Sequence, residues 1–450
     1  MNLETKTTTK YTPSPIHRKF YLSVLWKFWL CHGLAFAWMI FSIILSIPWV
    51  KDLGELVPVP VAIAFITGIA YIPGYLNAFM VASLLFDRQP SFKTLHPKEP
   101  VSILIACWNE EKGIVSTLQQ LAKQDYEGEM QIYVIDNNST DHTAEVAERL
   151  GKELGLNIRV IFEETPGKNH ALNKALQYVE TQLLITLDAD TLLHPQAVRR
   201  LVSRMKSAPE DVCAVAGAVL VRNSRENWLA RIQEWDYFLG IASIKRLQGL
   251  YQGTLVAQGA YSLYLTDAIK EVGGWPDAIG EDIVLTWAFL ERNYKVFFEP
   301  TAIAFTDVPT EFSHFARQRS RWARGMIEAL KRVKPWEQPR IFTRYLTGSN
   351  LVMPYLDFVY TFVWIPGLIA SFFGIFWIAG PQTLFVLPLA LLSNYFLYRY
   401  QKGVFRELGL HIRKNRIGFF FYVLCYQMIM SPVSVWGYIQ EFMQLRRVWK

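Results

Sequence analysis

Two carboxylates stand two residues apart at Asp188 and Asp190, directly after the apolar run 183–187. Mg²⁺ prefers one or two carboxylates together with the phosphates of a substrate. We therefore predict that Asp188 and Asp190 hold a divalent ion that neutralises a departing diphosphate. An Asp-x-Asp triplet also occurs in ordinary solvated turns, and its place after a buried strand is what favours the metal site.

A second pair of acids, Glu281 and Asp282, follows Gly280 and opens a predicted helix over 281–291. Acids in a first turn often do no more than interact with the helix dipole. A carboxylate in a closed, partly dry pocket can instead have a raised pKa and serve as a general base. We expect Asp282 to be that base and to take a proton from the hydroxyl group of an acceptor.

The third group is the run Gln318-Arg319-Ser320-Arg321-Trp322. On a helix, Gln318, Arg321 and Trp322 share one face. An arginine there can pair with a diphosphate through two hydrogen bonds, and a tryptophan can pack against the apolar face of a sugar ring. The alternative is a basic amphipathic helix on a membrane surface, and one helix with two faces can do both.

The elements that must position these groups alternate between residues 100 and 305. Strands are predicted over 101–106, 131–135, 158–162 and 183–187, and helices over 111–124, 141–154, 168–178 and about 227–248. This order implies an α/β fold with a parallel sheet covered on both faces. Ligands of such sheets bind beyond the carboxyl ends of the strands, so the residues after each strand are the relevant ones.

Polar residues follow every one of these strands: Asn109-Glu110, Asp136-Asn137, Gly167-Lys168 and Asp188-Ala189-Asp190. Neither a GxGxxG turn nor a GxxxxGK[ST] phosphate loop is present in the sequence. Carboxylates thus stand where glycines would hold phosphate in a dehydrogenase or an ATPase. A bridging cation is needed to bring a diphosphate to them.

Long uncharged runs flank this region. Hydrophobic residues make up 51% of the sequence and charged residues 19%, and the mean hydropathy is +0.14. Residues 29–50 and 57–86 carry no charge, 351–378 carry only Asp357, and 384–398 and 417–439 carry none. A membrane-spanning helix needs roughly 20 such residues. We predict two transmembrane helices within 29–86 and about three hydrophobic segments within 351–440.

Basic residues orient the chain in the membrane. Those before the first span favour a cytoplasmic N-terminus, so that residues 1–28 form a disordered cytoplasmic tail, 87–315 a cytosolic catalytic domain, 316–350 amphipathic interface helices and 441–450 a basic cytoplasmic tail. Three complete C-terminal spans would place that last tail outside, which conflicts with its charge. Pro432 is a candidate break in the last segment.

Other classes of protein fit the sequence less well. The net charge of +7 suits contact with anionic lipid headgroups. No basic run interleaved with aromatics stands apart from the membrane flanks, so we expect no nucleic-acid binding. The four cysteines have no CxxC spacing, which argues against zinc sites and a disulfide framework.

Taken together, these motifs resemble the processive family 2 glycosyltransferases, which make cellulose, hyaluronan, chitin and poly-N-acetylglucosamine. The run Thr306-Asp307-Val308-Pro309-Thr310 and the two N-terminal spans look most like the bacterial poly-β-1,6-N-acetylglucosamine synthases. Three residues depart from the family pattern: Ala106 stands in place of a frequent proline, Asn137 in place of a second aspartate, and Gly280 in place of the usual threonine before Glu-Asp. None of these departures removes a catalytic group.

The resemblance implies a GT-A (Rossmann-like) domain between transmembrane helices and inverting transfer from a UDP-sugar, with UDP-N-acetylglucosamine as the best guess. The product would be a growing β-linked exopolysaccharide of the biofilm kind. It implies Mg²⁺ or Mn²⁺ held mainly by Asp190 with Asp188 beside it, and Asp282 as catalytic base. The expected donor-binding residues are Asn109, Glu110, Asp136, Lys168, Gln318 and Arg321, and the expected acceptor-binding residues are Glu281 and Trp322.

The expected place is the cell inner (plasma) membrane, multi-pass, with the catalytic domain in the cytoplasm and a small membrane partner subunit as a possible companion. Three alternatives stay open. One is a hyaluronan-, chitin- or cellulose-type synthase, and another is a non-processive enzyme that adds one sugar to a lipid acceptor. The third is an inactive glycan-binding or export subunit.

Overall fold

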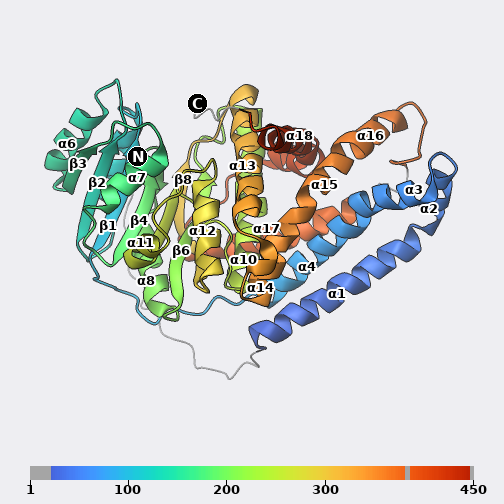
Figure 1. Cartoon of the computed structure of the whole chain (residues 1–450), viewed down its shortest axis with the longest axis horizontal. Helices are drawn as coiled ribbons and strands as arrows, with labels where there is room; N and C mark the ends of the chain where they lie inside the picture. Colours follow the sequence, from blue (N-terminus) through green and yellow to red (C-terminus); the bar gives the residue numbers. More distant parts are fainter. Residues whose placement is uncertain (1–21, 381–385, 446–450) are drawn as a thin grey trace.

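A computed structural model describes residues 22–380 and 386–445. It consists of an α/β part, at the left in Figure 1, and a group of long helices that extends from it to the right. Of the tails predicted at residues 1–28 and 441–450, the stretches 1–21 and 446–450 lie outside the described residues.

The first half of the sheet follows the predicted order. Strands β1 (Val101–Cys107), β2 (Met130–Asp136), β3 (Asn157–Phe162) and β4 (Leu183–Asp188) pair in parallel, in the spatial order β3-β2-β1-β4. Each begins and ends within one residue of its predicted bounds. Their carboxyl ends therefore meet at one edge, as the α/β reading requires.

The second half of the sheet is not parallel throughout, and the expectation of a parallel sheet is wrong there. Strand β7 (Tyr261–Leu265) runs antiparallel to both β4 and β6 (Val212–Val221), while β8 (Lys295–Thr306) runs parallel to β6. The short β5 (Leu192–Leu193) pairs antiparallel with β8. These strands are apolar runs buried on both faces, and such runs do not encode strand direction.

Helices cover both faces of the sheet, as predicted. Alternate residues of β1 point into two separate cores, Leu104 into one and Ile103 and Ile105 into the other. The first core also holds the apolar sides of α7 (Lys168–Leu176) and α12 (Glu281–Glu291). The second holds those of α5 (Gly113–Leu121), α6 (Thr143–Leu154) and α8 (Ala197–Ser207).

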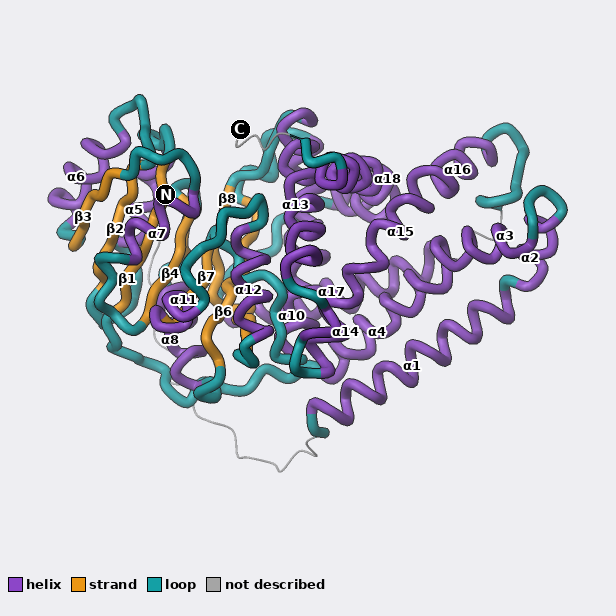
Figure 2. The backbone as a smooth tube through the Cα atoms, viewed as in Figure 1, coloured by secondary structure: helices purple, strands orange, loops and turns teal. Residues whose placement is uncertain are grey.

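The helix predicted over about 227–248 contains a change of winding. It consists of α9 (Trp228–Trp235), a π-helical segment η2 (Asp236–Ile241) and α10 (Ala242–Leu250). Single π turns inside α-helices are frequent at functional sites. The long helix α13 (Phe312–Arg332) carries the Gln-Arg-Ser-Arg-Trp run and stands next to α12 in Figures 1 and 2.

Four helical segments of the described chain are long and apolar enough to cross a membrane by length and composition. They are Val24–Leu45, Val59–Phe86, Ile341–Ser371 and Arg416–Phe442. The first is α1, the second joins α3 (Val59–Ile66) to α4 (Ile72–Phe86), the third runs from α14 (Ile341–Gly348) to α16 (Ile365–Ser371), and the fourth is α18. Helix α17 (Val386–Glu407) carries four charges in its last nine residues and is not among them.

Helix α18 lies against the α/β part at both of its ends. Near its start, Asn415 Nδ2 donates to the carbonyl of Arg231 at 2.8 Å, and near its end Lys331 of α13 pairs with Glu441 at 3.0 Å. Pro432 lies inside α18 without ending it. The proposed break at Pro432 is therefore wrong, because the helix continues from Arg416 to Phe442.

Candidate active site

The predicted metal ligands lie in the turn that follows β4. The hydroxyl of Thr117 on α5 donates to the carbonyl of Ala189 at 2.7 Å, which fixes the turn between Asp188 and Asp190. Burial and the neighbouring Asp188 carboxylate raise the pKa of Asp190 to about 6. A positive charge beside this turn therefore stabilises the ionised carboxylates.

The donor set suits a hard divalent ion that keeps substrate phosphates as ligands. Within the described ranges, no three or more His, Cys, Asp or Glu side chains gather into a ready metal cage. Two adjacent carboxylates and an open side fit Mg²⁺ or Mn²⁺ better than zinc, which takes three or four protein ligands.

Lys168 occupies the centre of the site. It is the first residue of α7, follows Gly167 with a φ of +140°, and forms an ion pair with Asp188. Burial alone would lower the pKa of its ammonium group. The carboxylates of Asp188, Glu281 and Asp282 more than offset that effect, so that the pKa lies above its usual value.

Asn137 holds the loop that carries this lysine. Its Oδ1 accepts the N–H of Gly167 at 2.7 Å, and its Nδ2 donates to the carbonyl of Thr165 at 2.7 Å. Its neighbour Asp136 is buried and accepts the N–H of Ser139 at 2.9 Å. An amide can both donate and accept where a carboxylate only accepts, so asparagine at 137 has a structural reason.

Of the two predicted residues after β1, Asn109 holds a loop in place and Glu110 belongs to the site. Asn109 has a φ of +55°, and its Oδ1 accepts the N–H of Thr140 at 2.7 Å. Glu110 is half-buried, and burial together with Asp190 and Asp188 raises its pKa to about 7. Glu110 thus faces the metal turn, while the side-chain oxygen of Asn109 is already used within the protein.

The predicted base lies at the start of α12. The N–H of Ile283 donates to Asp282 Oδ1 at 2.8 Å, and the N–H of Gly259 lies 3.4 Å from Oδ2. The adjacent Glu281 is buried, and burial and Asp282 raise its pKa to about 7 against the opposing effect of Lys168 and Arg321.

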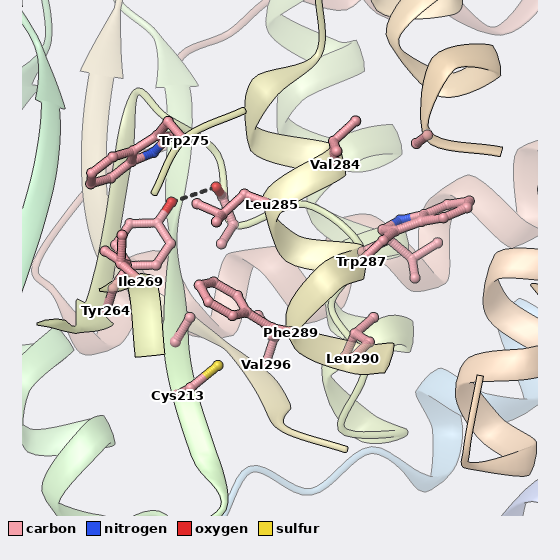
Figure 3. Close-up of a cluster of buried hydrophobic side chains, with 14 of the residues drawn as sticks. Cys213, Tyr264, Ile269, Trp275, Val284, Leu285, Trp287, Phe289, Leu290 and Val296 are labelled. Carbon is pink, nitrogen blue, oxygen red and sulfur yellow. Dashed lines mark hydrogen bonds between the residues drawn. The ribbon is translucent and has the colours of Figure 1, made fainter. Parts of the chain in front are cut away.

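A packed core holds α12 in this position. Leu285 and Phe289 point from α12 toward Cys213, Tyr264 and Trp275, and Val284 and Trp287 point to the opposite side of the helix (Figure 3), so that α12 is packed on both sides. The hydroxyl of Tyr264 donates to the carbonyl of Ala257 at 2.7 Å, which ties the loop of Gly259 to the same core. Burial of so many large side chains fixes the N-terminus of α12 relative to the sheet.

Helix α13 approaches α12 through two glycines. A Cβ atom at Gly280 would lie 2.9 Å from the Cα of Gly325, and one at Gly325 would lie 2.9 Å from the Cα of Gly280. Glu328 adds a hydrogen bond at 2.8 Å from the N–H of Ile279 to its Oε2. The glycine that departs from the family pattern therefore permits close helix contact here.

The predicted face of α13 is only partly realised. Arg321 and Trp322 are exposed, and Arg321 acts on the buried Glu281. Gln318 is half-buried, and its Oε1 has no hydrogen-bond partner among the described residues. Trp322 packs beside Tyr237, with 6.4 Å between ring centroids.

Sequence reasoning missed the role of two residues next to the metal turn. Asp307, which follows β8, pairs with Arg222 at 2.7 Å, and its carboxylate contributes to the raised pKa of Asp190. Tyr237 is buried in η2, and Asp190 and Asp188 contribute to its raised pKa after the larger effect of burial. Asp307 was only part of a family motif in the sequence, and a π turn gives no local signal that would have marked Tyr237.

These contacts bring the ends of β1, β4 and β8 and the starts of α7 and α12 around one set of acids. The chain belongs to the family described as "Glycosyltransferase like family 2", whose model matches residues 97–325 of the 450. It is a glycosyltransferase.

Its relatives include named enzymes. The poly-β-1,6-N-acetyl-D-glucosamine synthase of Staphylococcus epidermidis is 32% identical over 266 residues, which are 59% of this chain and 64% of that protein. The enzyme of the same name from Staphylococcus aureus strain COL is 34% identical over 235 residues, 52% of this chain and 56% of that protein. The match thus spans less than two thirds of the length of either relative.

A solved structure shares the fold. The mannosyltransferase PcManGT of Pyrobaculum calidifontis, in complex with GDP-Man and Mn²⁺, has a TM-score of 0.60 and 18% identity, over 85% of this chain and 99% of that one. The predicted GT-A fold is confirmed.

Proposed function

We propose that this enzyme is an inverting, membrane-embedded synthase that polymerises N-acetylglucosamine from its UDP-sugar into a β-linked glycan. One observation carries the proposal. Asp188 of the metal turn forms an ion pair with Lys168, and Lys168 also lies in the field of Glu281 and Asp282. The groups that would bind the donor diphosphate and the base that would activate the acceptor therefore surround a single lysine.

The donor side follows from this arrangement. Lys168 and Arg321 would offer positive charge to the diphosphate, and Gln318, Asp136 and Glu110 are the further residues that we assign to the donor. Mg²⁺ or Mn²⁺ held by Asp190 and Asp188 would stabilise the diphosphate as it leaves.

Transfer is a single displacement. The acceptor oxygen forms a bond to the anomeric carbon from the face opposite the diphosphate, and its proton passes to the carboxylate of Asp282. The bond from the anomeric carbon to the phosphate oxygen breaks, and UDP leaves with that electron pair. Inversion at the anomeric carbon turns an α-linked donor into a β-linked product.

The acceptor side is formed by α13 and α12. Trp322 is 41% exposed and offers a flat apolar surface to a sugar ring, and Glu281 interacts electrostatically with both Asp282 and Arg321. Stacking of a ring on an indole leaves the hydroxyl groups at the ring edge free to meet the base.

The proposal places the α/β part at the cytoplasmic face of the plasma membrane, with four crossings: α1, α3–α4, α14–α16 and α17. Helix α17 is assigned as a crossing from the contacts around its two ends, and α18 is assigned to the surface, although α18 and not α17 meets the criterion of length and composition. Residues after α16 contact the hairpin between α1 and α3, since Trp49 Nε1 donates to the carbonyl of Trp377 at 2.8 Å. The far end of α17 contacts the α/β part, where Arg200 pairs with Glu407 at 2.7 Å. Helix α18, held at both ends, then lies along the cytoplasmic surface.

Purified protein in lipid, supplied with Mg²⁺ or Mn²⁺ and a panel of UDP-sugars, tests the function. UDP release and the size and linkage of the product are measured. We expect UDP-N-acetylglucosamine to give long β-1,6-linked chains. One added sugar per acceptor would favour a non-processive enzyme, and no UDP release from any donor, alone or with a small membrane subunit, would contradict the proposal.

A further inference from the structure

Arg319 lies directly beneath Trp322 and is almost completely buried. Its side chain is 3% exposed, whereas Trp322 is 41% exposed. The Cζ atom of Arg319 lies 4.0 Å from the centroid of the Trp322 ring, 5.3 Å from that of Phe315 and 5.5 Å from that of Tyr237. The guanidinium group therefore occupies a cage of three aromatic rings, one of which is the proposed acceptor platform.

An ion pair holds this arginine in the cage. Nη2 of Arg319 lies 3.1 Å from Oδ2 of Asp236, which is itself buried. The same carboxylate oxygen accepts the hydroxyl of Tyr426 on α18 at 2.7 Å. Three elements thus meet under Trp322: α13 with the arginine, the π turn η2 with the aspartate, and α18 with the tyrosine.

A buried ion pair of this kind rarely adds to the stability of a fold, so its presence calls for another explanation. Taking two charges out of water is rarely repaid by their attraction, and apolar residues of similar volume usually pack there as well or better. Neither Nε nor Nη2 of Arg319 makes a hydrogen bond within the described part of the chain, so the contact of Nη2 with Asp236 is an ion pair by distance and leaves the guanidinium group incompletely satisfied. Planar guanidinium groups do, however, stack on aromatic rings in a way that ammonium groups cannot.

We propose that Arg319 and Asp236 form a positioning pair that sets the plane of Trp322 for the acceptor sugar and ties that platform to α18 through Tyr426. The inference rests on the proposed function, because it assumes that Trp322 binds the growing glycan. Arg319 touches neither donor nor acceptor. Its effect reaches the reaction through the tryptophan alone.

The ion pair between Arg319 and Asp236 also gives the two arginines of α13, Arg319 and Arg321, different roles. Arg321, which we assign to the donor diphosphate, is exposed and interacts with Glu281. Two positions earlier, Arg319 turns inward to Asp236. Loss of the inner arginine should therefore affect the acceptor and leave the handling of the donor intact.

The chain offers a matched control for the test. Arg324 lies on the same helix, is 7% exposed and forms its own ion pair across to α18, with 3.5 Å from its Nε to Glu441. Within the described residues, the ring of Trp322 stacks on Arg319 and lies beside Tyr237, and Arg324 does not stack on it. Arg319→Lys and Arg324→Lys each replace a buried guanidinium group of α13 by an ammonium group, but only the first removes a planar group from beneath the tryptophan.

The experiment measures two rates on each purified variant in lipid. One is transfer to a β-1,6-linked N-acetylglucosamine oligomer over a range of oligomer concentrations, and the other is slow UDP release from UDP-N-acetylglucosamine to water without oligomer. For Arg319→Lys we expect the KM for the oligomer to rise about tenfold, which is about 1.4 kcal/mol, with the donor KM and the hydrolysis rate unchanged. For Arg324→Lys we expect the oligomer KM of the wild type.

Tyr426→Phe provides a second, milder variant should Arg319→Lys fail to fold. It removes only the hydroxyl on Asp236, and we expect a smaller rise in the oligomer KM, about threefold. Equal oligomer KM values for Arg319→Lys and Arg324→Lys, or for Tyr426→Phe and the wild type, would overturn the positioning role.

The wild-type protein separates this inference from the proposed function. If it transfers no sugar to the oligomer, the proposed function itself fails and the positioning pair fails with it. If it does transfer sugar while the variants behave alike, only the positioning pair is wrong.

Discussion

At the scale of the residue, the site is a set of carboxylates that compete for one lysine. Lys168 pairs with Asp188 and also interacts with Glu281 and Asp282. Asp282 differs from the others, because two backbone N–H groups, those of Ile283 and Gly259, point at its carboxylate. These donors hold the carboxylate in one orientation, which a base in an in-line displacement requires.

Replacement of the base tests this assignment. Asp282→Asn keeps the shape of the side chain but removes its ability to accept a proton. We expect the rate of transfer to fall by a factor of about 10² to 10⁴, with the affinity for UDP, measured by calorimetry, within about twofold of the wild type. Asp267→Asn on the exposed side of α11 (Thr266–Glu271) is the control and should keep full activity. Substantial transfer by Asp282→Asn would remove Asp282 from the role of base.

Many of the residues of the candidate site could be predicted from the sequence. The acids at 188, 190 and 282 stand at the ends and starts of elements that a local pattern predicts well. Asp307 and Tyr237 could not be found, since they reach the metal turn only through the pairing of β8 and the winding of η2. Such contacts join residues that are far apart in the chain, so no local sequence pattern predicts them.

At the scale of the element, the distance between α12 and α13 sets how the proposed base and the proposed acceptor platform lie relative to each other. Gly280 and Gly325 set that distance, and no other residue type fits between the two backbones without movement. The start of α12 at Glu281 could be predicted from the sequence, whereas the contact between Gly280 and Gly325 could not. Strand direction beyond β4 was equally hidden, because buried strands of either direction are apolar throughout.

A methyl group at Gly325 should push these helices apart. We expect Gly325→Ala to lower the stability by about 1–3 kcal/mol, as overpacking does, and to reduce transfer more strongly than the binding of UDP. Gly33→Ala in α1 is the matched control, since nothing lies within 4 Å of its added Cβ. There alanine should be neutral or stabilising, by up to about 1 kcal/mol. Equal melting temperatures of Gly325→Ala and the wild type would show that the contact tolerates a side chain.

A buried lysine in α10 makes a pH-dependent prediction. Lys245 donates to the carbonyl of Val256 at 2.9 Å, and burial lowers its pKa to about 7 from 10.5. Between these values the unfolded chain binds a proton that the folded protein does not, so stability rises with pH across that window. The destabilising contribution of the lysine is complete at and below about pH 7 and vanishes above about pH 10.5.

Lys245→Met should remove this contribution. The lost hydrogen bond to Val256 changes the melting temperature equally at every pH, whereas the removed charge does not. Relative to the wild type, the melting temperature of the variant should therefore be highest at about pH 7 and fall back steadily towards pH 10.5. Lys270→Met, at an exposed position of α11, is the control and should show no such trend. A pH-independent difference for Lys245→Met would contradict a neutral buried lysine.

At the scale of the whole molecule, the sequence left open on which side of the membrane the C-terminal region lies. Basic residues placed the C-terminal region in the cytosol, and three apolar segments placed it outside. The contacts of α18 at both ends, to Arg231 and to Lys331, favour a helix that lies flat rather than crosses. Composition could not distinguish these cases, because an interfacial helix and a crossing helix can be equally apolar.

Cysteine labelling tests this topology. In a variant without native cysteines, we introduce Phe373→Cys between α16 and α17, or Gln444→Cys after α18, both at exposed positions. A membrane-impermeant maleimide added to intact cells should label position 373, and position 444 should react only after the membrane is opened. Labelling of position 444 from outside would show that α18 crosses.

The central claim is that loops from distant parts of the chain form one site for a nucleotide diphosphate, a divalent ion and an acceptor. The most direct measurement is a cryo-EM structure of the protein in lipid with UDP and Mn²⁺. We predict density for the ion at about 2.0–2.2 Å from an oxygen of Asp190, within the range for hard divalent ions, and the diphosphate between it and Lys168. UDP bound away from this edge of the sheet, or an ion that contacts neither Asp188 nor Asp190, would contradict the account.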